Sequence, residues 1–114
     1  MAKYECKLQG DFTTLLERIE AGILKGSISA SLEDGSDFQV GGVRCAVRVY
    51  ERYSMIGSNR VSLSITIVGD GDQLSVSAIT SGGSQAVLFK INTFGERAFL
   101  DQLVMVVESY KAGR

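Results

Sequence analysis

The amino-acid sequence predicts an α+β fold, in which an antiparallel sheet of five or six strands carries two helices packed on one face, in the order β-α-β-β-β-β-(β)-α. Three observations lead to this prediction. Two stretches, one near each end of the chain, repeat apolar residues at helical spacing. Several stretches between them alternate apolar and polar residues, as half-buried strands do. The length of 114 residues fits one domain, 1–114, with a single core.

The first strand and the first helix are predicted within residues 2 to 26. Residues 2–8 alternate, which is typical of a strand with one buried face. Asp11 is suited to cap the helix that follows, because its side chain can accept hydrogen bonds from the first free amides. Gly26 is placed to end this helix in a left-handed turn. The apolar stripe of the helix consists of Phe12, Leu15, Leu16, Ile19 and Ile23.

Residues 27 to 49 predict strands that are separated by a turn and interrupted by a glycine pair. A strand over 27–32 alternates serine with apolar residues, and the segment EDGSD, residues 33–37, is typical of a turn. The apolar positions then change from even to odd numbers across Gly41-Gly42. Because a one-residue slip turns core side chains outward, we interpret this pair as a β-bulge or sharp bend, with ligand binding by the two glycines as the alternative.

The next two strands are predicted to form a hairpin whose register follows from counting. Asp70-Gly71 is a favoured pair for a two-residue turn. A turn at these two residues pairs Ile67 with Leu74 and Ile65 with Val76. Every apolar residue of the hairpin then faces an apolar partner, so the turn chemistry and the apolar pattern support the same hairpin.

The end of the chain predicts a short strand and a second helix. Residues 86–92, AVLFKIN, are consistent with the optional sixth strand. Thr93 and Glu96 match a Thr-x-x-Glu capping box, so the helix is expected to begin after Thr93. Its apolar stripe consists of Phe99, Leu103, Val106, Val107 and Tyr110.

Composition and charge exclude several classes of function. The formal net charge of −1 provides no bulk attraction to nucleic acid or to anionic membranes. The chain has no histidine, so it lacks a Ser-His or Cys-His pair, and its two cysteines are too few for an all-cysteine zinc site. We therefore predict no metal and no cofactor. Cys6 and Cys45 share the phase of their apolar neighbours and are expected to be reduced core thiols.

The sequence carries no recognisable targeting or membrane segment. The first ten residues alternate polar and apolar side chains and lack the apolar run of a signal peptide. The longest apolar runs are too short to span a bilayer. We expect a cytoplasmic protein that does not enter the membrane.

An arginine- and serine-rich surface is predicted on the face of the sheet opposite the helices. Residues 44–60 contain four arginines against one glutamate. Three interpretations stay open: a solvated face, an interface between copies of the chain in a homo-oligomer, and a site for a small anionic ligand. Nucleic acid is less favoured, because the face carries one central aromatic residue and the chain is slightly acidic. The candidate interface residues are Arg44, Arg48, Tyr50, Ser62 and Ser64.

The glycine-containing loop at residues 81–85, SGGSQ, is a second candidate site. It matches neither a P-loop nor a dinucleotide-binding fingerprint. The apolar pattern of the preceding hairpin predicts pairs with even sums, such as Arg52 opposite Arg60 or Ser62. Two arginines on one face would repel each other unless an anion lay between them. We therefore hypothesise an anion pocket formed by Arg52, Arg60 and the backbone amides of Gly82, Gly83 and Ser84.

Several segments together resemble a known family. LEDGSDF, GGVRCAVRVYERYS, NRVSLS and AITSGGSQAVLFKINTFGE are similar to an uncharacterised family of small bacterial proteins, mostly from Gram-positive species, classed as a domain of unknown function. The resemblance covers about residues 1 to 110 and implies no activity, cofactor or catalytic residue. The order of elements also resembles the TATA-binding-protein-like topology. This likeness concerns element order alone and does not imply DNA binding, because a fold does not determine a function.

These observations predict a small non-enzymatic binding or interaction module that uses its arginine- and serine-rich sheet face. The alternative is an enzyme, or a cofactor- or anion-binding protein, with its site at Arg52, Arg60 and the loop 81–85. A deep pocket with Glu33 or Glu51 beside the arginines would favour the enzyme. A flat face buried against a second copy would favour the interaction module.

Overall fold

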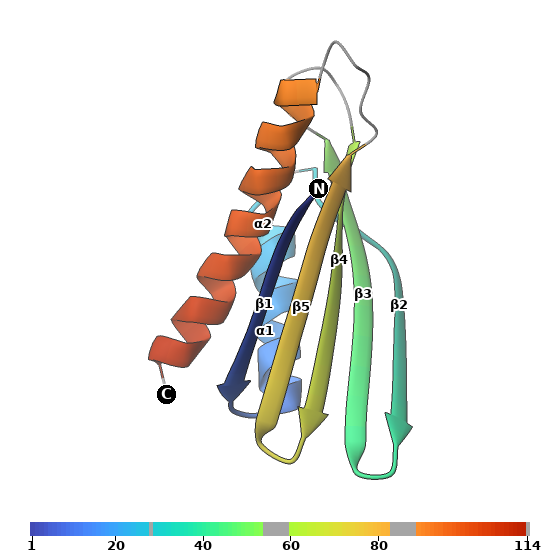
Figure 1. Ribbon diagram of the computed structural model, residues 1–114, viewed down its shortest axis with the longest axis vertical. Helices are drawn as coiled ribbons and strands as arrows, with labels where there is room; N and C mark the ends of the chain where they lie inside the picture. The colour runs from blue at the N-terminus through green and yellow to red at the C-terminus, as the bar shows by residue number, and fades with distance from the viewer. Residues whose placement is uncertain (28, 54–59, 83–88, 114) are drawn as a thin grey trace.

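A computed structural model describes residues 1–27, 29–53, 60–82 and 89–113. Within these ranges the chain forms five strands and two helices (Figure 1). All strand pairs are antiparallel, and the strand order is β1-β5-β4-β3-β2. The predicted α+β class is therefore confirmed. The elements are β1 (Ala2–Gln9), α1 (Phe12–Lys25), β2 (Ser31–Val40), β3 (Val43–Tyr53), β4 (Arg60–Asp70), β5 (Gln73–Gly82) and α2 (Phe89–Ala112).

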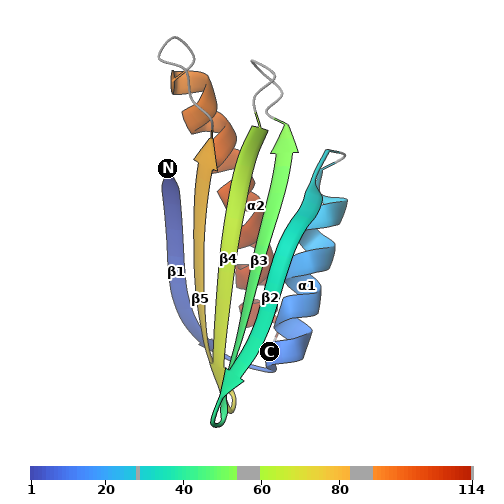
Figure 2. The same cartoon turned by 90° about the vertical axis from the view of Figure 1, so that its right-hand side faces the viewer.

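The molecule has two layers, a sheet and a pair of helices behind it. Figure 2 shows the five strands in front of both helices, with β4 at the centre of the sheet and β1 and β2 at its edges. The core lies between the layers, where alternate residues of β4 and β5 meet the apolar stripes of the helices. Its largest fully buried side chains are Tyr50, Phe99, Leu15, Ile19, Ile23, Leu63, Ile65, Ile67, Leu100, Leu103, Val61 and Val76.

Helix α1 begins where the sequence predicts, but it does not end in the predicted backbone conformation. Asp11 is the N-cap, and its carboxylate accepts hydrogen bonds from the backbone N–H of Thr14 at 2.9 Å and from its hydroxyl at 2.8 Å. Gly26 caps the other end with φ −77°, so the predicted left-handed turn is wrong. The position favours glycine because a Cβ atom there would collide with the side-chain amide of Gln102 and would lie 2.8 Å from the backbone carbonyl oxygen of Gly22.

Strand β2 runs through the segment that was predicted as a turn. Residues 33–37 lie inside β2, which pairs with β3 almost from end to end. The register shifts between Leu32 and Asp34, so this bulge, and not Gly41-Gly42, absorbs an extra residue. Pairing with β3 therefore overrides the local turn preference of EDGSD.

Two short turns connect the strands of the hairpins. Gly41-Gly42 joins β2 to β3 with φ 58° at Gly41, and Val40 pairs with Val43. The even-to-odd change of apolar phase is the ordinary result of a two-residue hairpin turn. The second turn lies at Gly71-Asp72, one residue later than predicted, with Asp70 opposite Gln73.

The shifted turn changes the partners in the hairpin of β4 and β5. Ile67 pairs with Val76 and Ile65 pairs with Ala78, so the predicted partners are wrong. The faces are still as predicted, because moving the turn by one residue shifts the register by two.

Helix α2 begins earlier than predicted. It starts at Phe89, so Thr93 and Glu96 lie inside the helix and do not form a capping box. Glu96 is buried, and its carboxylate lies 2.8 Å from the Met1 ammonium. Residues 89–92 of the optional sixth strand are helical, and 86–88 lie outside the described residues. Within the described ranges, neither helix is long and apolar enough to cross a membrane.

Candidate interaction face

The arginine stripe of β3 lies on the helix side of the sheet and not on the open side. The register pairs Ala46 with Ile67, Arg48 with Ile65 and Tyr50 with Leu63. Side chains of paired residues share a face, so the even-numbered residues of β3 join the core face. The predicted even pairing sums are wrong. The sequence-predicted interface is consequently divided, with Arg44, Arg48 and Tyr50 on the helix side and Ser62 and Ser64 on the open side.

Arg48 connects the sheet to helix α1 and to the edge strand β2. Its side chain is 12% exposed. It donates hydrogen bonds to the carboxylate of Glu20 at 2.9 Å and to that of Asp37 at 3.0 Å. Burial acts to lower the pKa of Arg48, but these hydrogen bonds and the two negative charges outweigh it and raise the pKa. Arg48 therefore has a structural explanation without any external ligand.

Arg44 and Arg52 also pack against the helical layer. The Arg44 guanidinium lies 4.3 Å from the centre of the Phe12 ring and donates a hydrogen bond to Thr13 at 3.1 Å. The Arg52 guanidinium lies 4.5 Å from the centre of the Phe99 ring and donates to the Gln102 side-chain carbonyl at 2.9 Å. Burial lowers the pKa of Arg52. These contacts place both arginines at the margin of the core.

Gln102 is a structural residue that the sequence reasoning missed. Its amide group donates hydrogen bonds to the backbone carbonyls of Gly22 and Ile23, both at 3.2 Å, while its carbonyl accepts from Arg52. It thereby satisfies the end of α1 from a position on α2. A single glutamine in a helix, between Phe99 and Leu103 of the apolar stripe, carries no sequence signal for such a role.

The two arginines of the hypothesised anion pocket do not come together. Arg52 pairs with Val61 on the helix side, whereas Arg60 pairs with Tyr53 on the open side. Gly82 ends β5 opposite Val61, and Gly83 and Ser84 lie outside the described residues. Anion binding at the hypothesised pocket stays a prediction, which titration with phosphate, sulfate and nucleotides would test.

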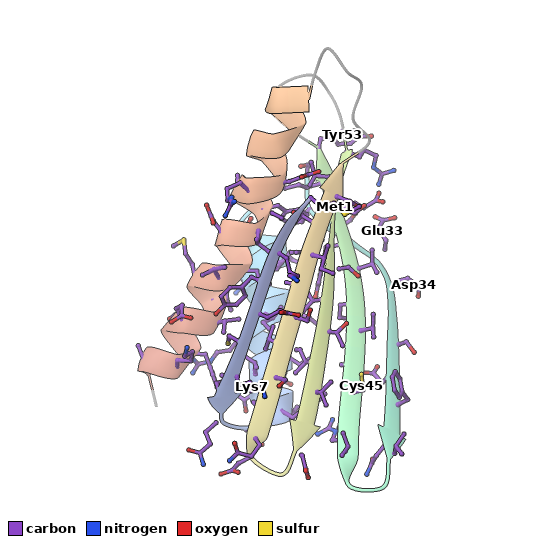
Figure 3. The ribbon with its side chains drawn as sticks, viewed as in Figure 1. Met1, Lys7, Glu33, Asp34, Cys45 and Tyr53 are labelled. Atoms are coloured by element: carbon purple, nitrogen blue, oxygen red, sulfur yellow. The ribbon has the colours of Figure 1, made fainter. Side chains whose placement is uncertain are left out.

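Arg60 already has acidic partners on the open face. Its guanidinium forms ion pairs with Glu51 and, at 3.7 Å, with Glu33. Ser62 donates a hydrogen bond to Glu51 at 3.2 Å, and the Arg60 guanidinium lies 5.6 Å from the centre of the Tyr53 ring. Figure 3 shows Tyr53 and Glu33 near the same end of the sheet. Glu33 and Glu51, the two carboxylates that were to mark an enzyme site, therefore lie beside Arg60 and neutralise its charge.

The open face is apolar at one side and polar at the other. We define it by one face of each strand: Lys3, Glu5 and Lys7 of β1; Ser75, Ser77, Ile79 and Ser81 of β5; Arg60, Ser62, Ser64, Thr66 and Val68 of β4; Val43, Cys45, Val47, Val49 and Glu51 of β3; and Asp34, Ser36, Phe38 and Val40 of β2. Phe38 is 53% exposed and Val40 is 72% exposed. No described element packs on this face (Figure 2).

A shallow hollow lies on the polar half of the open face. Its volume is about 480 Å³, and it spans β1, β5 and the nearer side of β4. Its lining combines hydroxyl groups with one charged residue of each sign on the edge strand: Glu5, Cys6, Lys7, Thr66, Val68, Ser75, Val76 and Ser77. The hollow exists because serine and threonine side chains are small, so they leave open a space that larger side chains would fill.

The cysteines are divided between the two faces. Cys6 is half-buried and packs against the core, as predicted. Cys45 is half-buried on the open face (Figure 3), so its assignment to the core is wrong. In the part of the chain that the structure describes, both thiols are free, and no cluster of three or more Cys, Asp or Glu side chains is arranged to hold a metal ion.

Comparison with known proteins places the chain in a family. The sequence matches the family of unknown function DUF6054 over residues 1–111, nearly its whole length. The chain belongs to this family. No curated protein matches it.

Proposed function

We propose that this member of the DUF6054 family is a small non-enzymatic binding module that contacts another protein through the open face of its sheet. The observation that carries the proposal is the apolar half of that face, where Phe38 and Val40 stand exposed beside the half-buried side chains of β3. Contiguous exposed apolar surface on a small protein marks an interaction site. We also propose a cytoplasmic location, in which the thiols of Cys6 and Cys45 stay reduced.

The core supports this proposal because it is complete without the open face. The residues that fill the space under the helices come from the opposite face of β1, β3, β4 and β5 and from the two helices. The valines of β3 therefore do not contribute to the packing between sheet and helices. Their position on the other side has a physical reason if that side is covered by a partner, since burial of such side chains is worth about 1.5–3 kcal/mol each.

Charge supports a protein partner over nucleic acid. On the open face, the positive charge of Arg60 is compensated by Glu51 and Glu33. Lys3 and Lys7 alternate with Glu5 along β1. A mixed face of this kind lacks the continuous positive surface that binding to phosphate backbones requires.

The proposal is tested by photo-crosslinking in the cells that make the protein. A photoreactive amino acid is placed at Val47, in the middle of the open face, and in a matched variant at Glu17, on the exposed side of α1. We expect covalent adducts to protein from position 47 and at least about tenfold fewer from position 17. Equal yields from the two positions, with unchanged thermal unfolding of both variants, would overturn the proposal.

A further inference from the structure

We infer that the open face binds the same face of a second copy of the chain, with a two-fold axis that runs along the central strand β4. This inference rests on the proposed function and names its partner. A two-fold axis in the plane between two stacked sheets, parallel to β4, lays β4 over its own copy. It also lays β1 over the second copy's β2, and β5 over the second copy's β3, while every residue keeps its height along the strands.

The registers of the five strands place one side chain from each strand in a row across the open face. One row consists of Lys7, Ser75, Val68, Cys45 and Phe38. The row nearer the β4 start consists of Lys3, Ile79, Ser64, Val49 and Asp34. Figure 3 shows Lys7 and Cys45 at the same height on the sheet. The proposed axis places each row over itself in reverse order.

Charge complementarity is the first argument for this arrangement. Lys3 and Asp34 stand at opposite ends of one row, on the two edge strands. Reversal of the row brings Lys3 of each copy over Asp34 of the other, which forms two opposite-charge pairs at the rim. Like charges do not meet in this row. Rim charges of this kind select one partner and one orientation.

Shape complementarity is the second argument. Phe38 is 53% exposed and rises at one end of its row, and the hollow of about 480 Å³ lies at the other end. Reversal of the row places Phe38 over the hollow between Lys7 and Ser75 of the second copy. The ring would fill a space that has small side chains on its floor, and the Lys7 stem would cover its edge. The two-fold axis makes this contact twice.

Apolar contact and area give the third argument. Ile79, which is 42% exposed, meets Val49 of the second copy, and Val68 meets its own counterpart. Five strands about 4.8 Å apart, each about ten residues long at about 3.3 Å per residue, present a face of about 800 Å². A specific interface buries about 800 Å² on each partner. The face is thus large enough for a stable dimer of stacked sheets.

Pairing through the free edge of β2 is a less favourable way to form a dimer. An antiparallel pair of β2 strands centred between Gly35 and Ser36 would place Asp34 directly opposite Asp37 of the other copy. Like charges in cross-strand pairs are destabilising, and the bulge next to Glu33 interrupts the edge. In this register the free edge therefore disfavours self-pairing, while the two rows that begin with Lys3 and Lys7 are complementary to themselves.

Sedimentation analysis of the purified full chain over a range of concentrations tests the inference. We expect a dimer whose dissociation constant rises at least about tenfold in Lys3→Glu and in Asp34→Lys. The double variant Lys3→Glu/Asp34→Lys should return to within about threefold of the native constant, because the two charges are exchanged across the interface. Glu17→Lys, on the exposed side of α1, is the matched control and should leave the constant unchanged.

A second pair of variants tests the fit of Phe38 to the hollow. Phe38→Ala removes the ring and Ser77→Leu fills the hollow, and each should weaken the dimer at least about tenfold while the circular dichroism spectrum stays native. A chain that is monomeric at every concentration would overturn the inference, as would a double charge variant as weak as the single ones. If the chain is monomeric but position 47 crosslinks to other proteins, the proposed function stands and only the dimer is refuted.

Discussion

In a two-layer fold the inner face of a strand is expected to be apolar and the outer face polar, but strand β3 shows the reverse. The face toward the helices carries Arg44, Arg48 and Arg52 with Ala46 and Tyr50 between them. The face toward the open side carries only half-buried apolar side chains along most of its length: Val43, Cys45, Val47 and Val49. The charged face is the inner one, and the apolar face is the outer one.

This difference teaches that a strand at the margin of a core can satisfy arginines inside it. Helix α1 supplies Glu20 for Arg48, and aromatic rings on both helices lie under Arg44 and Arg52. The long arginine stems cover apolar surface while the guanidinium groups reach acceptors at the edge. The valines on the outer side have no such explanation within the chain, which is why the open face is the proposed interaction site.

The largest expected effect comes from placing the same carboxylate on each side of β3. Ala46 is 1% exposed, so Ala46→Asp buries an unpaired charge and should lower the free energy of unfolding by about 3–5 kcal/mol. Val47→Asp, on the open side, should lower it by about 1 kcal/mol or less. Urea unfolding at dilute protein measures both without a contribution from self-association. Equal losses would contradict the assignment of the two faces.

A smaller effect is expected from Gln102, which supports the inner side of β3. Gln102→Leu leaves Arg52 and the carbonyls of Gly22 and Ile23 without this partner, so it should lower the free energy of unfolding by about 1–3 kcal/mol. Met105→Leu is the control on the same helix, because Met105 is 72% exposed and should tolerate the change. Urea unfolding of the two variants tests the role of Gln102, and equal stability would refute it.

The hydroxyl of Tyr50 should contribute nothing to stability. It is buried and has no hydrogen-bond partner within the described part of the chain, and burial raises its pKa. Tyr50→Phe removes an unsatisfied polar group while keeping the ring, so the free energy of unfolding should stay the same or rise by up to about 1 kcal/mol. Thermal unfolding measures the change. A clear loss of stability would mean that the hydroxyl has a partner.

The smallest effect is a dependence on pH at the start of α1. Hydrogen bonds from the backbone and hydroxyl of Thr14, and the nearby charge of Arg44, lower the pKa of Asp11. A lowered pKa in the folded state means that the ionised carboxylate stabilises the fold above its unfolded pKa, and this contribution is lost as the pH falls through the folded pKa. Asp11→Asn should therefore lose less stability than the native chain between about pH 5 and pH 3. Parallel acid titrations of the two proteins, followed by circular dichroism, would show this, and identical curves would contradict it.

Local features of the fold could be predicted from the sequence because nearby residues determine them. Asp11 caps α1 as predicted, since capping depends on residues within one turn. The faces of β4 and β5 are also as predicted, because alternation does not depend on the turn residue. The turn position itself could not be predicted, since Asp70-Gly71 and Gly71-Asp72 both suit a two-residue turn. The Gly10 amide donates to the Asp72 carbonyl at 2.9 Å, a contact between distant segments that stabilises the observed turn.

The position of the candidate site depended on which face of β3 is buried, and the alternation of apolar and polar residues does not determine this. In β3 both faces alternate cleanly, and apolar content assigned the valines to the core. The register with β4 reversed that assignment, separated Arg52 from Arg60, and placed Glu51 and Glu33 beside Arg60. Ser62 and Ser64 were predicted on the open face and do lie there, because they belong to β4, whose other face is fully apolar.

By itself, the sequence determined the class of the fold, the first helix with its cap and the inner faces of β4 and β5, because these depend on spacing within single elements. Only the tertiary structure decided that β2 continues through EDGSD, that Gly26 makes room for Gln102, and which face of β3 is covered. The physical reason is that the backbone geometry of a strand is the same for its two faces, so it does not determine which of them is buried. The placement of helices from distant parts of the chain determines which of the two becomes the interior.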